Sequence, residues 1–180
     1  YQNEKEFLKA KSSNELRQKN GVKIQTLSQS EILDLEPSLA PVFYNGQIFI
    51  GSRHTTNPLM VSKKIFENFL NRGGSFIKSE VNNLISEDTA ITLNYNHNDY
   101  KFDKVIVCAG AWSNNLSKKI GENFPLNTER GYHVMFNNYG LINRPIGWSQ
   151  SGFYLVQLEE GLRAAGTVEL AGLSKPENKK

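Results

Sequence analysis

The chain has 180 residues, of which 38% are hydrophobic and 11% aromatic, so it can bury a core and is neither disordered nor fibrous. Its net charge of +3 comes from 21 basic and 18 acidic residues that are interspersed, without the basic stripe and interleaved aromatics that indicate nucleic-acid binding. A single cysteine excludes a disulfide framework and favours a reducing compartment, and no cysteine or histidine spacing indicates a metal site.

The ends of the sequence indicate its context. No run of about 18 apolar residues predicts a membrane span, and no secretion signal opens the chain. The first residue is Tyr1 rather than methionine, and the chain stops soon after an apolar strand pattern. We therefore expect an internal piece of a longer cytoplasmic polypeptide.

The first fifty residues predict short helices and strands. Apolar positions among many charged ones predict a surface helix over 4–19, which Gly21 would end. An alternating pattern predicts a strand over 22–27. A helical turn follows over 30–36, with Ser30 as its cap and a proline after it.

Two further patterns lie between residues 42 and 74. β-forming residues over 42–50 are broken at Asn45-Gly46, which predicts a hairpin or a bent strand. Asn57 can cap a helix that Pro58 begins and Gly73-Gly74 ends, and its apolar stripe predicts packing on a sheet.

The middle of the chain predicts a strand over 76–81 and then an antiparallel meander over 91–102, with its turn at 96–99. Three β-branched residues, Val105-Ile106-Val107, then predict a buried parallel strand with Cys108 inside the core. This strand turns at Gly110 into a short helix. Such a turn can receive a phosphate, although an ordinary strand-to-helix turn explains it equally well.

After residue 121 the pattern changes to strands without long helices between them, over 130–136, near 148, over 153–156 and over 162–170. This arrangement is typical of an antiparallel sheet. The whole chain is therefore expected to be α+β (mixed α/β): an antiparallel sheet with helices, plus a unit of helix, strand, meander and parallel strand.

Several motifs occur in a consistent order along the chain: Leu35-Glu36-Pro37, the capped helix that ends in Gly-Gly, the 105–113 turn with Ala109-Gly110-Ala111-Trp112, and the stretches 129–133 and 161–169. In these motifs the chain resembles the FAD-dependent D-amino acid oxidase and dehydrogenase (DAO) family, and most of all its bacterial D-amino acid dehydrogenase-like branch. The resemblance extends over nearly the whole chain.

The resemblance implies a two-domain flavoenzyme whose chain passes between an FAD domain and a substrate domain. Residues 1–52 and 122–174 would be substrate-domain parts, 53–121 a returning part of the FAD domain, and 175–180 a tail. The G-x-G-x-x-G fingerprint of the family is absent from these 180 residues. We therefore expect the chain alone to bind FAD weakly or not at all and to be inactive without the remainder of the FAD domain.

The reaction implied is oxidation of the Cα–N bond of a D-amino acid or related amine by hydride transfer to the flavin. One alternative is a same-fold flavin oxidase of secondary amines, such as glycine, sarcosine or hydroxyproline, or of a modified tRNA base. Another is a binding domain that has lost its flavin half. As a dehydrogenase the protein would pass electrons to a respiratory acceptor, and peripheral association with the inner face of the membrane is then an alternative to a purely cytoplasmic location.

The resemblance also suggests residues for binding the substrate. Tyr154 matches a position where relatives place a tyrosine over the substrate, although a half-buried sheet tyrosine is an equal alternative. Arg163 could hold the substrate carboxylate, or it could pair with a glutamate across the sheet. Tyr132 and His133 face opposite sides of a strand, and Tyr132 is marginally favoured. His54 would lie near the flavin, or have no role.

On the cofactor side the resemblance points to Val81, Gly110, Ala111 and Trp112 as residues that line FAD. The chemistry requires no protein nucleophile and no metal, because the cofactor carries the difficult step. No residue of this chain is therefore assigned a catalytic or metal-binding role.

Overall fold

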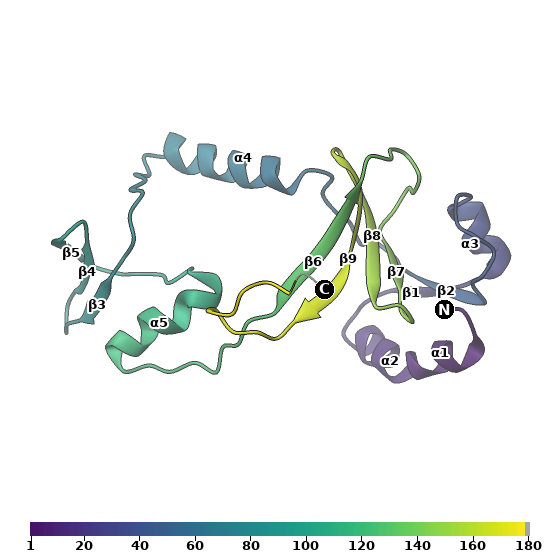
Figure 1. The fold of residues 1–180 in the computed structure, drawn as a ribbon, viewed down its shortest axis with the longest axis horizontal. Coiled ribbons are helices and arrows are strands. Elements are labelled where there is room, and N and C mark those ends of the chain that lie inside the picture. Colours follow the sequence, from purple (N-terminus) through teal and green to yellow (C-terminus); the bar gives the residue numbers. More distant parts are fainter. Residues whose placement is uncertain (179–180) are drawn as a thin grey trace. The chain divides into compact units, whose positions relative to one another are not determined.

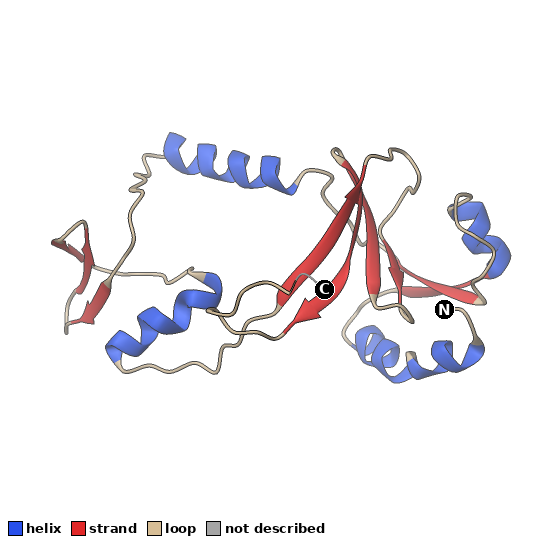
Figure 2. Ribbon diagram, in the orientation of Figure 1, coloured by secondary structure: helices blue, strands red, loops and turns tan. Residues whose placement is uncertain are grey.

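A computed structural model describes residues 1–178, which form two compact units (Figure 1). The first unit combines Tyr1–Phe66 with Gly131–Thr167, and the second combines Glu67–Arg130 with the segment that begins at Val168. Both units contain helices and strands (Figure 2). The expected mixed α/β class with antiparallel sheets is confirmed.

The N-terminal helical segment consists of two helices rather than the one predicted over 4–19. The helices α1 (Glu4–Lys9) and α2 (Lys11–Lys19) meet at Ala10, whose N–H bonds to the Phe7 carbonyl three residues back. This tighter turn interrupts the regular four-residue ladder. Gly21, with a φ of 84°, follows the end of α2 as predicted.

The helix α3 (Gln29–Leu35) begins earlier than predicted, because its cap is Ser28 rather than Ser30. The Ser28 hydroxyl accepts from the Glu31 N–H, and the Glu31 carboxylate accepts from the Ser28 N–H at 2.7 Å. This is the capping box expected of a serine three residues before a glutamate. The bond from the Ser28 backbone, and then that from its hydroxyl, lower the pKa of Glu31.

Of the two alternatives predicted over 42–50, a hairpin or a bent strand, the hairpin at Asn45-Gly46 is wrong, because both residues lie inside a strand. β1 (Ile24–Ser28) and β2 (Asn45–Phe49) pair antiparallel, with Gly46 opposite Leu27. A Cβ on Gly46 would lie 3.0 Å from side-chain carbons of Ile32 on α3. The glycine therefore lets α3 pack close to β2. Its presence at this position is explained by packing rather than by a turn.

Four antiparallel strands make the larger sheet, in the order β6-β9-β8-β7. Their bounds are Arg130–Phe136 for β6, Ile146–Trp148 for β7, Phe153–Leu158 for β8 and Gly161–Glu169 for β9. The antiparallel sheet predicted after residue 121 is confirmed. Its register places Tyr154 opposite Ala165 and Val156 opposite Arg163.

The helix α4 (Pro58–Asn71) has the predicted cap, with the Met60 N–H donating to Asn57 Oδ1 at 2.8 Å. The expected packing of α4 on a sheet is not found, because none of its residues is buried in the described chain. Ile65, for example, is 67% exposed. The predicted apolar stripe is present along α4, but no other part of the described chain covers it fully.

The small sheet of the second unit has the order β3-β4-β5, with bounds Asn83–Ser86, Ile91–Tyr95 and Asn98–Phe102. The predicted turn of the meander is confirmed, and Asn96 and His97 take it with φ values of 51° and 62°. The strand predicted over 76–81 is wrong: this stretch is irregular, with Ile77 exposed, and β3 begins only at Asn83.

The buried parallel strand predicted at Val105-Ile106-Val107 is also not formed. The stretch is irregular, Ile106 is 86% exposed and Cys108 is exposed. Among the described residues no strand pairs with this stretch, so its backbone has no ladder to join. The turn after it does form, as a 3-10 helix η1 (Gly110–Trp112), α5 (Ser113–Ser117) and η2 (Lys118–Ile120).

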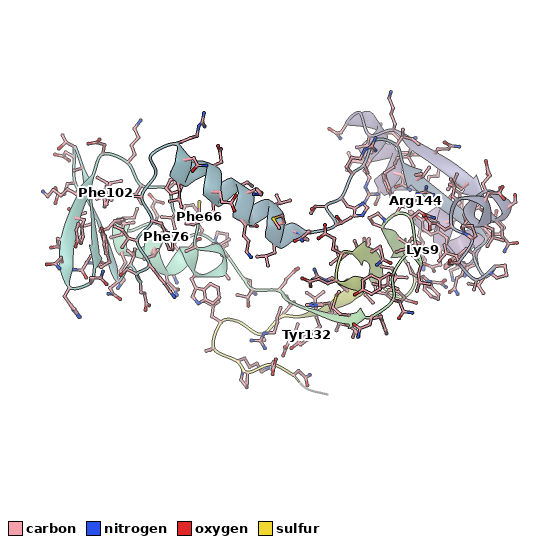
Figure 3. The ribbon with its side chains drawn as sticks, turned by 90° about the horizontal axis from the view of Figure 1, so that it is seen from above. Lys9, Phe66, Phe76, Phe102, Tyr132 and Arg144 are labelled. Carbon is pink, nitrogen blue, oxygen red and sulfur yellow. The ribbon has the colours of Figure 1, made fainter. Side chains whose placement is uncertain are left out.

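A buried carboxylate connects α3 to the loop before β7. Glu36 is only 3% exposed, and its Oε2 accepts from the Asn143 N–H at 2.9 Å. Its Oε1 lies 3.4 Å from Arg144 Nη1, an ion pair without hydrogen-bond geometry, while Nη1 also donates to the Leu35 carbonyl. Arg144 projects from the loop after β6 (Figure 3). The Leu35-Glu36-Pro37 motif thus has a structural role.

We expect Glu36→Gln to lower the free energy of unfolding by about 1–2 kcal/mol, because it removes the charge that faces Arg144 and weakens the acceptor of the Asn143 N–H. Urea denaturation would measure this loss. The control Glu15→Gln, on the exposed side of α2, should change stability by less than about 0.5 kcal/mol. Equal effects of the two substitutions would contradict a stabilising role for Glu36.

Candidate functional site

The register of β8 and β9 places the two main substrate-binding candidates on one face of the larger sheet. Tyr154 pairs with Ala165 and Arg163 pairs with Val156. Paired residues share a face, and so do residues two positions apart on a strand, so all four lie on the same side. The face therefore combines a phenol and a guanidinium with small apolar neighbours.

Tyr154 is 63% exposed, so it is not the half-buried sheet tyrosine of the structural alternative. Its ring lies over Gly147, which is its partner on β7. A Cβ at residue 147 would stand 2.8 Å from Tyr154 Cε1, closer than real Cβ atoms approach other carbons. The missing side chain at Gly147 therefore lets the phenol ring lie close to the sheet.

Arg163 does not make the glutamate pair considered from the sequence. That ion pair instead joins Arg130 and Glu169, at 3.2 Å between Nη1 and Oε2. Arg163 Nη2 lies 3.5 Å from His133 Nδ1 on β6. Its Nε is buried and has no hydrogen-bond partner in the described chain. Because this atom is covered, an anion could meet Arg163 only at its Nη groups.

His133 shares the Arg163 face, because the two side chains touch. Tyr132, the residue before it on β6, is expected on the opposite face by the alternation of a strand. The sequence favoured Tyr132 marginally, whereas this geometry favours His133. The alternation of the strand was visible in the sequence, but only the neighbouring strand β9 shows which of the two faces carries Arg163.

His54 is exposed, in the loop that precedes α4. Two residues of the same loop bond to the β8–β9 turn: Asn57 Nδ2 donates to Glu159 Oε2 at 2.7 Å, and Thr56 Oγ1 lies 3.3 Å from Glu159 Oε1. The loop is thus attached to the end of the sheet. In the described part of the chain His54 itself makes no hydrogen bond to the Tyr154 face.

The proposed cofactor-lining residues all belong to the second unit, whereas Tyr154, Arg163, Tyr132 and His54 all belong to the first. Gly110 has a φ of 54°, and a Cβ there would meet nothing within 4 Å. Ala111 continues the same turn and Trp112 is 60% exposed. Val81 lies in the irregular segment before β3.

These residues fit a flat cofactor as one wall of its site rather than as its main cradle. An open glycine turn and an exposed indole allow close approach of a ring system and of backbone groups. The glycine-rich fingerprint that cradles a pyrophosphate is absent from the sequence, and α5 has only five residues.

A cavity in the first unit is a different site. Its volume is about 130 Å³, and its lining is almost wholly apolar, including Phe43, Trp148 and Leu155. Leu155 neighbours Tyr154 on β8, so the cavity lies on the opposite face of the sheet. It offers no charged group to a polar substrate, and we regard it as a packing gap between the sheet and the loop 38–43.

Comparison with known proteins decides the family. A model of the family described as FAD-dependent oxidoreductase (DAO) matches residues 1–179. The chain belongs to this family. A D-amino-acid oxidase from Bradyrhizobium diazoefficiens is 32% identical over 165 residues, which are 91% of this chain and 39% of that protein. The expected family is therefore confirmed.

Two solved structures show the same fold. A glycine oxidase from Bacillus cereus superposes with a TM-score of 0.78 at 17% identity, over 100% of this chain and 49% of that one. An L-alpha-glycerophosphate oxidase from Mycoplasma pneumoniae, solved with FAD bound, superposes with a TM-score of 0.79 at 22% identity, over 93% and 48%. At this identity the likeness concerns the fold alone.

The chain spans less than half the length of these relatives. No helix among residues 1–178 is long and apolar enough to cross a membrane. In the same residues no group of histidine, cysteine and acidic side chains could hold a metal ion.

We expect Gly147→Ala to displace the Tyr154 ring, because the new methyl group would stand 2.8 Å from Cε1. A crystal structure of the variant would show the phenol moved off the sheet. The matched control is Gly131→Ala on β6, where a Cβ meets nothing within 4 Å and the sheet should stay unchanged. A Tyr154 ring that keeps its position in Gly147→Ala would show that the ring does not depend on this glycine.

Proposed function

We propose that the full-length protein is an FAD-dependent oxidoreductase that oxidises the Cα–N bond of D-amino acids or related amines. The observation that supports this most is the sheet face on which Tyr154 and Arg163 lie together in the first unit. Membership of the family supports FAD as the cofactor. Bound FAD supplies the hydride acceptor for such a reaction.

Arg163 would bind the substrate carboxylate. Its guanidinium makes an exposed contact with His133, and a carboxylate accepts well from a guanidinium. Tyr154, exposed over Gly147, would lie against the substrate, and Val156 and Ala165 would give the apolar surface around it. The role of these side chains is to orient the Cα–H bond, which accounts for much of the rate when the cofactor performs the chemistry.

Val81, Gly110, Ala111 and Trp112 would line the FAD from the second unit. The fingerprint glycines would come from the part of the protein outside this chain, as would the strands beside Val105–Val107. We accordingly propose that residues 1–52 and 122–174 serve the substrate domain and 53–121 the FAD domain, with 175–180 as a tail. A small-molecule amine, the remainder of the FAD domain and a respiratory electron acceptor are the proposed partners, in the cytoplasm or at the inner face of the membrane.

We expect D-amino acids, and not their L forms, to reduce the flavin of the full-length protein. The measurement is the loss of flavin absorbance under anaerobic conditions, with glycine, sarcosine and proline as further substrates. Reduction by glycine, sarcosine or proline alone would support the flavin chemistry but show that D-amino acids are not the substrates. No reduction by any of them would contradict the proposed function and favour a binding domain.

We expect Ile65→Asp to destabilise the full-length protein by about 2 kcal/mol, because the stripe of α4 would be covered by the rest of the FAD domain and the carboxylate would be buried there. Thermal unfolding and retention of FAD on gel filtration would both report it. The control Asn71→Asp adds the same charge on the side of the helix opposite the stripe and should cost less than about 1 kcal/mol. Equal behaviour of the two variants would show that Ile65 faces water in the full-length protein.

A further inference from the structure

We infer that Glu159 is a positioning residue for hydride transfer, because it fixes the start of α4 on the tip of the β8–β9 hairpin. This inference rests on the proposed function, since it assumes that a substrate held by the first unit reacts with a flavin lined by the second. Glu159 would touch neither of them. It would act by holding the helix along which the chain leaves the first unit.

The carboxylate of Glu159 is bound at both of its oxygens. Its Oε2 accepts from Asn57 Nδ2 at 2.7 Å, and its Oε1 accepts from Thr56 Oγ1 at 3.3 Å. The Glu159 N–H in turn donates to the Thr56 carbonyl at 3.0 Å. One residue of the hairpin turn thus binds two consecutive residues of the loop before α4, through both its side chain and its backbone. The charge of the acceptor strengthens the two side-chain bonds.

Asn57 uses both ends of its side-chain amide. Its Nδ2 donates to Glu159, and its Oδ1 accepts from the Met60 N–H at 2.8 Å, which caps α4. The residue that caps the helix is therefore also the residue that the hairpin holds. Because Asn57 directly precedes Pro58, the first residue of α4, movement of Asn57 away from Glu159 would carry the start of the helix with it.

The hairpin tip is also attached to the loop that follows β6. Gln157 Nε2 donates to the Asn138 carbonyl at 3.2 Å, and the Tyr139 hydroxyl donates to the Glu160 carbonyl at 3.4 Å. The tip therefore joins two loops, the one after β6 and the one before α4. Glu159 supplies the side-chain bonds of the second junction.

Within the described residues the chain passes between the two units at three points, which follow Phe66, Arg130 and Thr167. The first point lies inside α4. The other two lie on β6 and β9, which are neighbours in the sheet and are joined by the Arg130–Glu169 ion pair. Two adjacent strands form one ribbon, which allows the units to rotate about it as about a hinge. The passage through α4 would restrain that rotation.

A helix transmits a displacement at its start to its end. α4 has 14 residues and is therefore about 21 Å long. A tilt of about 10° at Asn57 would move the far end of the helix by about 4 Å. Misplacing reacting groups by about 1 Å can lower a rate about 100-fold, whereas binding of the substrate to one unit is far less sensitive. The expected signature of a loosened α4 is slower reduction of the flavin with little change in substrate affinity.

The test exchanges the donor and the acceptor of the Asn57–Glu159 bond in the full-length flavoprotein. Asn57→Asp keeps a good helix cap but sets two carboxylates against each other. Adding Glu159→Gln restores the bond in the opposite direction, because the glutamine amide donates to the introduced carboxylate. The matched control is Glu160→Gln, which removes a charge from the next, exposed residue of the same turn.

Two measurements report separately on the bond and on the reaction. Hydrogen exchange of peptides that cover 54–61 and 157–162 shows whether the loop stays attached to the turn, and it requires no turnover. Peptides from β1 and β2 are the internal reference, since a general loosening would speed exchange there as well. Anaerobic mixing with the amine that best reduces the flavin gives the rate constant of reduction and the substrate dissociation constant.

We expect Asn57→Asp to speed exchange in the two peptides about fivefold or more, with no change in β1 and β2. The same variant should slow flavin reduction about tenfold, with the dissociation constant within about twofold. Asn57→Asp/Glu159→Gln should return both exchange and reduction to within about twofold of the wild type. Glu160→Gln should match the wild type in every measurement.

Unchanged exchange in Asn57→Asp would show that the bond does not hold the loop, and the inference would be wrong. Faster exchange with an unchanged rate of reduction, or a loss confined to the dissociation constant, would overturn the positioning role, as would a double variant that recovers nothing. Failure of every amine to reduce the flavin, with exchange still raised by Asn57→Asp and restored in the double variant, would contradict the proposed reaction, while the attachment of α4 through Glu159 would stand.

Discussion

The register between β8 and β9 is the constraint on which the candidate site depends. Tyr154 opposite Ala165 and Val156 opposite Arg163 place a phenol and a guanidinium on one face. A slip of one residue would turn every side chain of a strand to the other face, and Arg163 would then point toward the side of Leu155 and the apolar cavity. The short Glu159-Glu160 turn between the strands limits such a slip, and its Glu159 is bound to Thr56 and Asn57.

Two glycines in the first unit allow a neighbouring side chain to pack directly against a strand. Gly147 allows the Tyr154 ring to lie against β7, and Gly46 allows Ile32 to lie against β2. Neither glycine has the positive φ that makes glycine necessary in a turn. Both glycines are explained by the space that a neighbouring side chain requires. Asn-Gly is also a common turn sequence, and for that reason the sequence suggested a turn at Asn45-Gly46.

The sequence predicted well those elements whose signals are local. The cap of α4 at Asn57, the turn at Asn96-His97 and the antiparallel sheet after residue 121 all depend on a few adjacent residues or on strict alternation. The sequence left open the answers that depend on a distant partner. Whether His133 or Tyr132 shares a face with Arg163 is decided by β9, some thirty residues away along the chain.

The two largest differences have one physical cause. The sequence of 105–107 is that of a buried strand and the sequence of α4 is that of a helix on a sheet, yet Ile106 and Ile65 are exposed. Hydrophobic periodicity reports what a segment contacts in the complete fold, and it does not say whether the contact lies within the same 180 residues. The same holds for Gly110, where a Cβ would meet nothing within 4 Å. These three features share one property: each carries the sequence signal of a contact that residues 1–178 do not supply.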